Sequence, residues 1–321
     1  MLKLNYSKLK KILLLCIAAM TAFSAMAQDI NQATESYNNG AMELQMGNNG
    51  AALEYFKSAL TMGEALGEDG AELVNNCKKA IASTSLSMAK DLYNAKDFAG
   101  AAEAFKQAKE IAEGYGEAEI AAEAGELVGQ ANLNLYNQAG KDALKAKDFA
   151  GAIANFTKVV ELDPANGTAA LQLGQAYMNT GNTEEAVKFL TVAMENGQEK
   201  NAKTILSKMY LKMAQASLKT KNYTQVMELA AKSNEYLENG NAYKLAASAA
   251  QKLGKSDECI TLYEKYLEAS PKAKDAGGVI CTIAVLYQQA GNKEKAKEYY
   301  QKIVTDPQYG ATAQEQLKAL N

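Results

Sequence analysis

An identical heptapeptide stands at two places in this chain, and it constrains the fold more than any other feature. Ala-Lys-Asp-Phe-Ala-Gly-Ala occupies Ala95–Ala101 and again Ala146–Ala152. Chance rarely produces such a match, so it predicts an internal repeat. Each copy precedes a helical pattern with an aromatic residue followed three positions later by a small or β-branched one, such as Phe105 and Ala108. A repeat of this kind buries its apolar face only against its neighbours.

Five further copies of the pattern follow shorter turn signals. These signals are Gly47-Asn48, Gly181-Asn182, Asn222-Tyr223, Gly254-Lys255 and Gly291-Asn292. We therefore predict seven helix pairs, each joined by such a turn. Their expected bounds are 33–66, 82–113, 133–164, 167–196, 207–238, 240–271 and 277–307, with a cap at 309–321. Surplus glycine-poor residues between the first three repeats, such as 71–95, predict elongated helix pairs in the N-terminal half.

The repeats resemble the tetratricopeptide repeat (TPR) family. In the clearest copy, Leu173-Gly174 and Tyr177 match the Leu-Gly…Tyr signature of the family's first helix. Ala186 and Ala193 match the small positions of its second helix. The helix-ending proline of the family has counterparts at Pro164, Pro271 and Pro307. Tyrosine or a small residue replaces the tryptophan of the family pattern, because the chain has no tryptophan.

This resemblance implies a fold class and a general role. The fold is an all-α, TPR-like α-solenoid of about seven antiparallel helix pairs in a right-handed superhelix, with elongated N-terminal pairs and a C-terminal capping helix. The family provides binding scaffolds of many kinds, so the resemblance implies binding without naming the partner.

The composition removes most catalytic chemistry. The chain has no histidine and no arginine. The chain therefore cannot form a Ser-His or Cys-His nucleophile pair, an imidazole metal ligand or a guanidinium clamp. Cys77, Cys259 and Cys281 are odd in number and lack C-x-x-C spacing, so we interpret them as small packing residues, with a Cys259–Cys281 disulfide as the alternative. We predict no enzyme activity, no cofactor and no metal site.

The first residues have the pattern of a secretory signal. Four lysines between positions 3 and 11 precede an apolar run over 12–23, and Ala25-Met26-Ala27 follows. The run is shorter than the ~20 residues that cross a bilayer. We predict a signal peptide over 1–27, cleavage between Ala27 and Gln28, and a mature chain 28–321 in the periplasm or outside the cell. Removing four lysines and no acid changes the formal net charge from −3 to −7, which disfavours a nucleic acid partner.

Lysine and amide side chains gather on one face of the predicted first helices, which line the concave groove in the family that the chain resembles. The candidate partner-binding residues are Asn137, Lys141, Lys145, Gln172, Gln175, Asn179, Lys208, Lys212, Gln215, Lys219, Lys244 and Lys252. These side chains donate hydrogen bonds to carboxylates and to extended peptide backbone. Ordinary solvated lysine on a helix face is the competing interpretation. The carboxylate-clamp subset of the family uses arginine, which is missing here.

We expect a non-catalytic scaffold of the bacterial cell envelope that binds a protein or peptide with an acidic segment along this groove. Association with envelope complexes, without integration into the membrane, fits this role. A glycan- or solute-binding accessory of an outer-membrane uptake system is the alternative. It would require clusters of exposed aromatic residues, and the absence of tryptophan counts against it.

Overall fold

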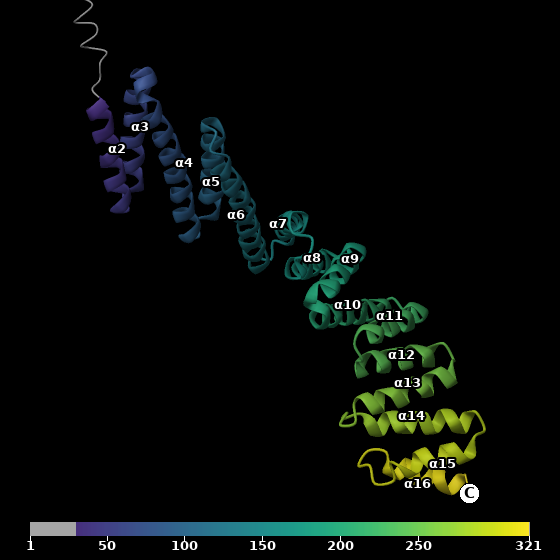
Figure 1. Cartoon of the computed structure of the whole chain (residues 1–321). Helices are drawn as coiled ribbons and strands as arrows, with labels where there is room; N and C mark the ends of the chain where they lie inside the picture. The colour runs from purple at the N-terminus through teal and green to yellow at the C-terminus, as the bar shows by residue number, and fades with distance from the viewer. Residues whose placement is uncertain (1–29, 321) are drawn as a thin grey trace, which may run out of the picture. The chain divides into compact units, whose positions relative to one another are not determined.

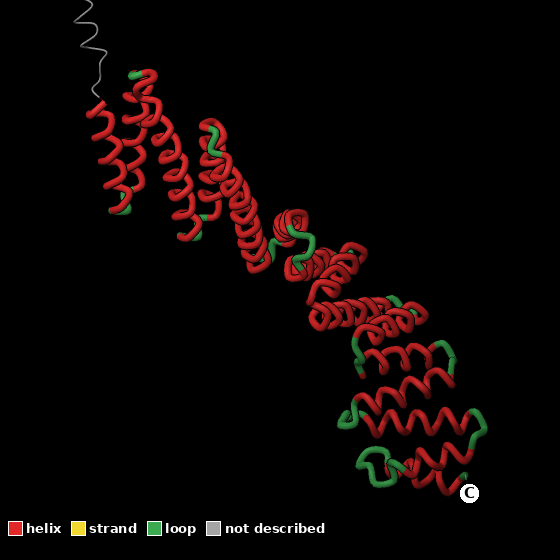
Figure 2. Tube along the Cα trace, in the orientation of Figure 1, coloured by secondary structure: helices red, strands yellow, loops and turns green. Residues whose placement is uncertain are grey.

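The computed structural model describes residues 30–320, and within them the regular structure is entirely helical (Figures 1 and 2). The all-α fold expected from the sequence is confirmed. The residues divide into two compact units, one reaching to Lys141 and one beginning at Asp142, and each is described by itself. The predicted signal peptide, 1–27, lies outside the described residues.

The N-terminal unit is built from long helices. It contains α2 (Ile30–Gln45), α3 (Asn49–Ala65), α4 (Ala71–Asn94), α5 (Phe98–Tyr115) and most of α6 (Ala118–Lys145). Helices α4 and α6 have 24 and 28 residues, against 14 for α8. This confirms the predicted elongation. Helices α4 and α6 begin well before the expected starts at 82 and 133. No proline lies in the surplus segments, and Gly125 and Gly129 are accommodated within α6.

The C-terminal unit continues as shorter helix pairs closed by a cap. It contains α7 (Phe149–Leu162), α8 (Gly167–Thr180), α9 (Thr183–Ala193), α10 (Glu199–Lys219), α11 (Tyr223–Tyr236), α12 (Gly240–Lys252), α13 (Ser256–Ala269), α14 (Ala276–Gln289), α15 (Lys293–Gln301) and α16 (Gly310–Ala319). We call α8, α10, α12 and α14 the first helices, and α9, α11, α13 and α15 the second helices. Each first helix packs against its second helix, and α10 also contacts α8 and α12. Helix α16 packs on α15, as expected of a cap.

Each described pair turns through one left-handed residue, and in five of the seven pairs the next residue is an Asp or Asn whose side chain caps the following helix. In the two heptapeptide copies the left-handed residue is a lysine, Lys96 (φ 64°) or Lys147 (φ 59°). Asp148 then caps α7 by accepting a hydrogen bond from the Gly151 backbone N–H at 3.0 Å. A Cβ at Gly151 would lie 2.3 Å from the Asp148 carboxylate. The repeated Lys-Asp-Phe-Ala-Gly sequence therefore encodes one left-handed turn and the N-terminal cap of the helix that follows it.

We expect Lys147→Gly to stabilise the protein by about 0.5–1 kcal/mol. The left-handed backbone costs a residue with a Cβ about 1–2 kcal/mol, and the greater freedom of glycine in the unfolded chain offsets part of that gain. Gly181 and Gly254 already occupy the equivalent positions of other repeats. Urea unfolding followed by circular dichroism measures the difference. The matched control is Lys158→Gly, within α7, which should lose about 1 kcal/mol. A destabilised Lys147→Gly protein contradicts this account.

Small residues allow the two helices of a pair to approach closely. Ala186 on α9 is fully buried, and a Cβ at Gly174 on α8 would lie 2.7 Å from Leu190 Cγ. In the N-terminal unit, a Cβ at Gly40 would lie 2.8 Å from the ring of Phe56. The large residues that face these small ones, Phe56 on α3 and Leu190 on α9, are at most 1% exposed.

The cysteines serve this packing as free thiols. Cys77 on α4 and Cys259 on α13 are fully buried, and Cys281 on α14 is partly exposed. Cys259 occupies the small position that Ala186 fills in the earlier repeat. Burial raises the pKa of both Cys77 and Cys259 to about 11, which keeps them protonated and poorly nucleophilic near neutral pH.

Candidate functional site

Helix α10 presents a lysine-rich face to solvent. Lys208, Lys212, Gln215 and Lys219 are all exposed, and their spacing of four, three and four residues places them on one side of the helix. Leu206, Met209 and Ala214 are buried on the other side. The predicted residues of this helix therefore share one accessible surface.

The same face continues onto α12 and forms a shallow hollow. Gln215 of α10 meets Asn241, Lys244, Leu245 and Ser248 of α12 around a cavity of about 280 Å³. We call the exposed surface of α8, α10 and α12 the first-helix groove. Its predicted members are Gln172, Gln175, Asn179, Lys208, Lys212, Gln215, Lys219, Lys244 and Lys252.

The remaining predicted residues are not all brought to this groove. Asn137 and Lys141 belong to the N-terminal unit, so the structure does not join them to it. Lys145 Nζ lies 3.3 Å from a carboxylate oxygen of Asp142, within the same helix. On α8, Asn179 donates its amide to the Gln175 carbonyl at 2.9 Å, which turns this side chain back onto its own helix.

Lys244 is neutralised by a carboxylate that lies outside the predicted first-helix faces. Its Nζ lies 2.5 Å from Asp275, the residue that precedes α14. The Tyr266 hydroxyl donates to the other oxygen of Asp275 at 2.6 Å, and Lys244 also lies over the Tyr266 ring, 5.6 Å from its centroid. These hydrogen bonds from Lys244 and Tyr266 lower the pKa of Asp275. Burial and the hydrogen bond to Asp275 raise the pKa of Tyr266 to about 12.

We expect Asp275→Asn to reduce the loss of stability in acid. The pKa of Asp275 is lower in the folded than in the unfolded chain, so its contribution is present above the ordinary aspartate value of 3.8 and disappears as pH falls through the lower folded value. Urea unfolding at pH 5 and pH 2.5 measures the difference. Lys244→Gln should reduce the same acid loss, because it removes one of the two donors. An unchanged pH dependence in both variants would show that Asp275 is not coupled to folding.

The other groove lysines keep their charge available. Lys208, Lys212, Lys219 and Lys252 form no ion pair with any residue of 30–320. Beyond α12 the lysines stop. The corresponding face of α14 carries Cys281, Thr282 and Val285, which line a hollow of about 270 Å³ with Tyr309. The positive part of the surface is therefore limited to α10 and α12.

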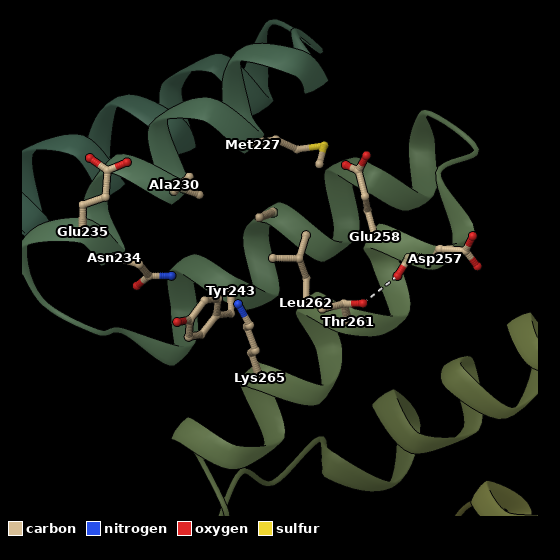
Figure 3. Close-up of a pocket in the computed structure, with 12 residues that line it drawn as sticks. Met227, Ala230, Asn234, Glu235, Tyr243, Asp257, Glu258, Thr261, Leu262 and Lys265 are labelled. Carbon is tan, nitrogen blue, oxygen red and sulfur yellow. Dashed lines mark hydrogen bonds between the residues drawn. The ribbon is translucent and has the colours of Figure 1, made fainter. Parts of the chain in front are cut away.

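A larger pocket opens on the second helices, where the sequence analysis placed no site (Figure 3). It has a volume of about 630 Å³ and lies between α11, α12 and α13. Its uncharged lining residues include Met227, Ala230, Ala246, Thr261 and Leu262. The signal available in the sequence was the pair of small residues at outward positions, Ala231 and Thr261, which leave space between the two second helices.

Charged side chains surround this pocket. Glu235, Asp257 and Glu258 contribute carboxylates, and Lys265 contributes the one ammonium group among its lining residues (Figure 3). Lys265 lies over the ring of Tyr243, 5.7 Å from the centroid. The pocket therefore has a negative rim around an apolar floor, the opposite charge from the first-helix groove.

The fold and these surfaces define a helical-repeat protein. Tetratricopeptide repeat models match residues 143–209, 240–272 and 278–305. These segments are tetratricopeptide repeats, as the sequence pattern predicted. They cover α8, α12 and α13 completely and α10 as far as residue 209, but they do not cover α11.

The chain is also similar to individual proteins. The chain is 26% identical over 201 residues to tetratricopeptide repeat protein 8 of Caenorhabditis elegans. This alignment covers 59% of this chain and 38% of that protein. The chain thus matches well under half the length of this relative. Crystal structures of MamA (21% identity, TM-score 0.34) and of YrrB, described as a TPR protein with an unusual peptide-binding site (19% identity, TM-score 0.30), are also similar. The first alignment covers 56% of this chain and 94% of MamA, and the second 58% and 91% of YrrB.

Two further properties concern the described residues only. Within 30–320, no helix combines the length and apolar character needed to cross a membrane. The same residues contain no group of three or more cysteine, aspartate and glutamate side chains arranged to hold a metal ion.

Proposed function

We propose that this chain is a non-catalytic scaffold that binds another protein or peptide along its first-helix groove. The observation that supports this most is the group of four exposed lysines without ion pairs within 30–320, Lys208, Lys212, Lys219 and Lys252, on two adjacent helices. The chain as a whole is net acidic, so this local excess of positive charge requires an explanation. An acidic segment of a partner would neutralise it through charge-assisted hydrogen bonds.

The neighbouring amide and hydroxyl side chains support an extended peptide as the form of that segment. Gln215, Asn241 and Ser248 line the hollow between α10 and α12, and their side chains offer both donors and acceptors. Backbone groups of an extended chain can pair with them while its carboxylates approach the lysines. The lack of histidine and arginine supports a binding role over a catalytic one.

We further propose that the protein acts in the bacterial cell envelope. The support is the sequence alone: the lysines, apolar run and Ala-Met-Ala site of residues 1–27. Expression of the full chain in a Gram-negative bacterium, followed by fractionation and N-terminal sequencing, tests this. Recovery from the periplasm or medium with Gln28 as the first residue is expected, and a cytoplasmic chain that retains Met1 overturns it.

A comparative pull-down from envelope extracts tests the binding function. The baits are the parent protein, a Lys212→Glu/Lys219→Glu variant, and a control Lys232→Glu/Lys293→Glu variant with the same change in charge on second helices. We expect mass spectrometry to find proteins with acidic segments that are lost only with the first variant. Recovery of the same proteins by all three baits would place binding outside the first-helix groove.

A further inference from the structure

The pocket between α11, α12 and α13 is kept open by small residues at its base and on its walls. Ala230 and Ala246 are buried at its base, where larger side chains would close it. Ala231 and Thr261 stand at exposed positions on its two walls, α11 and α13. The Thr261 hydroxyl donates to the Asp257 carbonyl of its own helix at 3.0 Å, so this hydroxyl already has a hydrogen-bond acceptor (Figure 3). Met227 and Leu262 complete an apolar floor that remains partly open to water.

Its carboxylates are only partly neutralised. Glu258 pairs with Lys255 at 3.2 Å, whereas Glu235 and Asp257 have no ion pair within residues 30–320. Glu235 lies near the end of α11, and Asp257 lies at the start of α13. In Figure 3 the apolar residues Met227, Ala230 and Leu262 lie between Glu235 and Asp257, whose carboxylates point outward at the two ends. The apolar floor thus has one carboxylate beyond each end, with Lys265 as the ammonium group among the lining residues.

The pocket and the first-helix groove lie on opposite sides of α12. Ala246 faces the pocket, and Lys244 and Ser248, two positions away on either side, face the groove. Two residues of an α-helix turn through about 200°, so the two sets of side chains point in opposite directions. A partner in one site therefore leaves the other accessible.

We propose that this pocket docks a second protein segment, in which an apolar side chain is flanked on both sides by lysine or arginine. The apolar side chain enters the recess and displaces water from Met227 and Leu262. The two basic residues approach Glu235 and Asp257, which gain the ion partners they lack. Acidic segments suited to the first-helix groove are repelled here, so charge directs each partner to its own face.

Selection from a displayed library of random 12-residue peptides tests this proposal with the purified protein. Peptides are selected on the parent and depleted on an Ala231→Phe/Thr261→Phe variant, whose two new rings fill the pocket from exposed positions. The peptides that remain should carry an apolar residue between lysines or arginines, and the filled variant should bind them at least 10-fold more weakly. If no such peptides remain, or if they lack basic residues, the proposal is wrong.

Neutral variants then isolate the contribution of charge. Glu235→Gln/Asp257→Asn should weaken the selected peptides about 10-fold and reduce the salt dependence of their binding. The control Glu228→Gln/Glu184→Gln removes one acid from α11 and one from the first turn of a second helix, as the test variant does, but neither residue lines the pocket. Equal binding by both variants overturns the proposed role of the carboxylates. The Lys212→Glu/Lys219→Glu variant should retain these peptides, which separates this test from that of the first-helix groove.

Discussion

Replacing Gly174 by leucine is expected to lower the free energy of unfolding by about 3 kcal/mol, at the upper end of the range for overpacked cores. Even the first added atom has no room. A Cβ at this position would lie 2.7 Å from Leu190 Cγ and 3.1 Å from the Ala186 carbonyl oxygen. The backbone carbonyl cannot move without disturbing α9, so the two helices must separate and lose the contacts that bury Leu190.

Urea unfolding followed by circular dichroism measures this effect. Gln175→Leu is the matched control, because it introduces the same side chain one position away at a half-exposed site. It should change the free energy of unfolding by less than ~0.5 kcal/mol, as surface substitutions usually do. Ala186→Phe, on the facing helix, should destabilise the protein in the same way as Gly174→Leu. A Gly174→Leu protein as stable as its control would show that α8 and α9 do not pack in this register.

Charge reversal in the first-helix groove is expected to weaken an acidic partner about 100-fold. Hydrogen bonds to charged groups contribute more than neutral ones, and Lys212→Glu/Lys219→Glu replaces two such attractions by repulsion. Lys212 and Lys219 are exposed on α10, so the substitutions should leave the fold intact. Association should slow more than dissociation accelerates at low salt, and the difference should diminish as salt screens the charges.

The partner for this measurement is a protein identified by the pull-down. Its affinity is determined by titration calorimetry or surface plasmon resonance at low and moderate salt, with helicity checked by circular dichroism. Lys232→Glu/Lys293→Glu should bind within twofold of the parent protein, since both lysines lie on second helices. Tight binding by the groove variant would show that Lys212 and Lys219 are ordinary solvated residues.

The helix pairs could be predicted from the sequence because their turns are local. The cap at Asp148 and the left-handed residue at Lys147 are adjacent, and the same chemistry recurs at Gly181-Asn182. The packing column is also periodic, so Phe156 and Leu190 could be placed in the core without a structure. Only short-range rules are needed for either prediction.

The charge and shape of the surfaces could not be predicted in the same way, because they depend on contacts between residues that are far apart in the sequence. The repeat pattern gives no information about such contacts. Asp275 reaches Lys244 from the loop before α14, so the charge of that lysine could not be judged from its own helix. The pocket required Ala231 of α11 and Thr261 of α13 to lie opposite each other across α12. Neither Ala231 nor Thr261 indicates a pocket on its own, because small residues are common throughout this alanine-rich sequence.

The two buried cysteines provide native probes of local unfolding. Cys77 lies in the N-terminal compact unit and Cys259 in the C-terminal one, and both are 0% exposed. A thiol reagent reaches such a group only when the surrounding helices separate, so its labelling rate reports the free energy of that local opening. With Cys16 and Cys281 replaced by serine, the chain carries one native probe in each half. The cooperativity between the halves can then be measured without attaching a fluorophore.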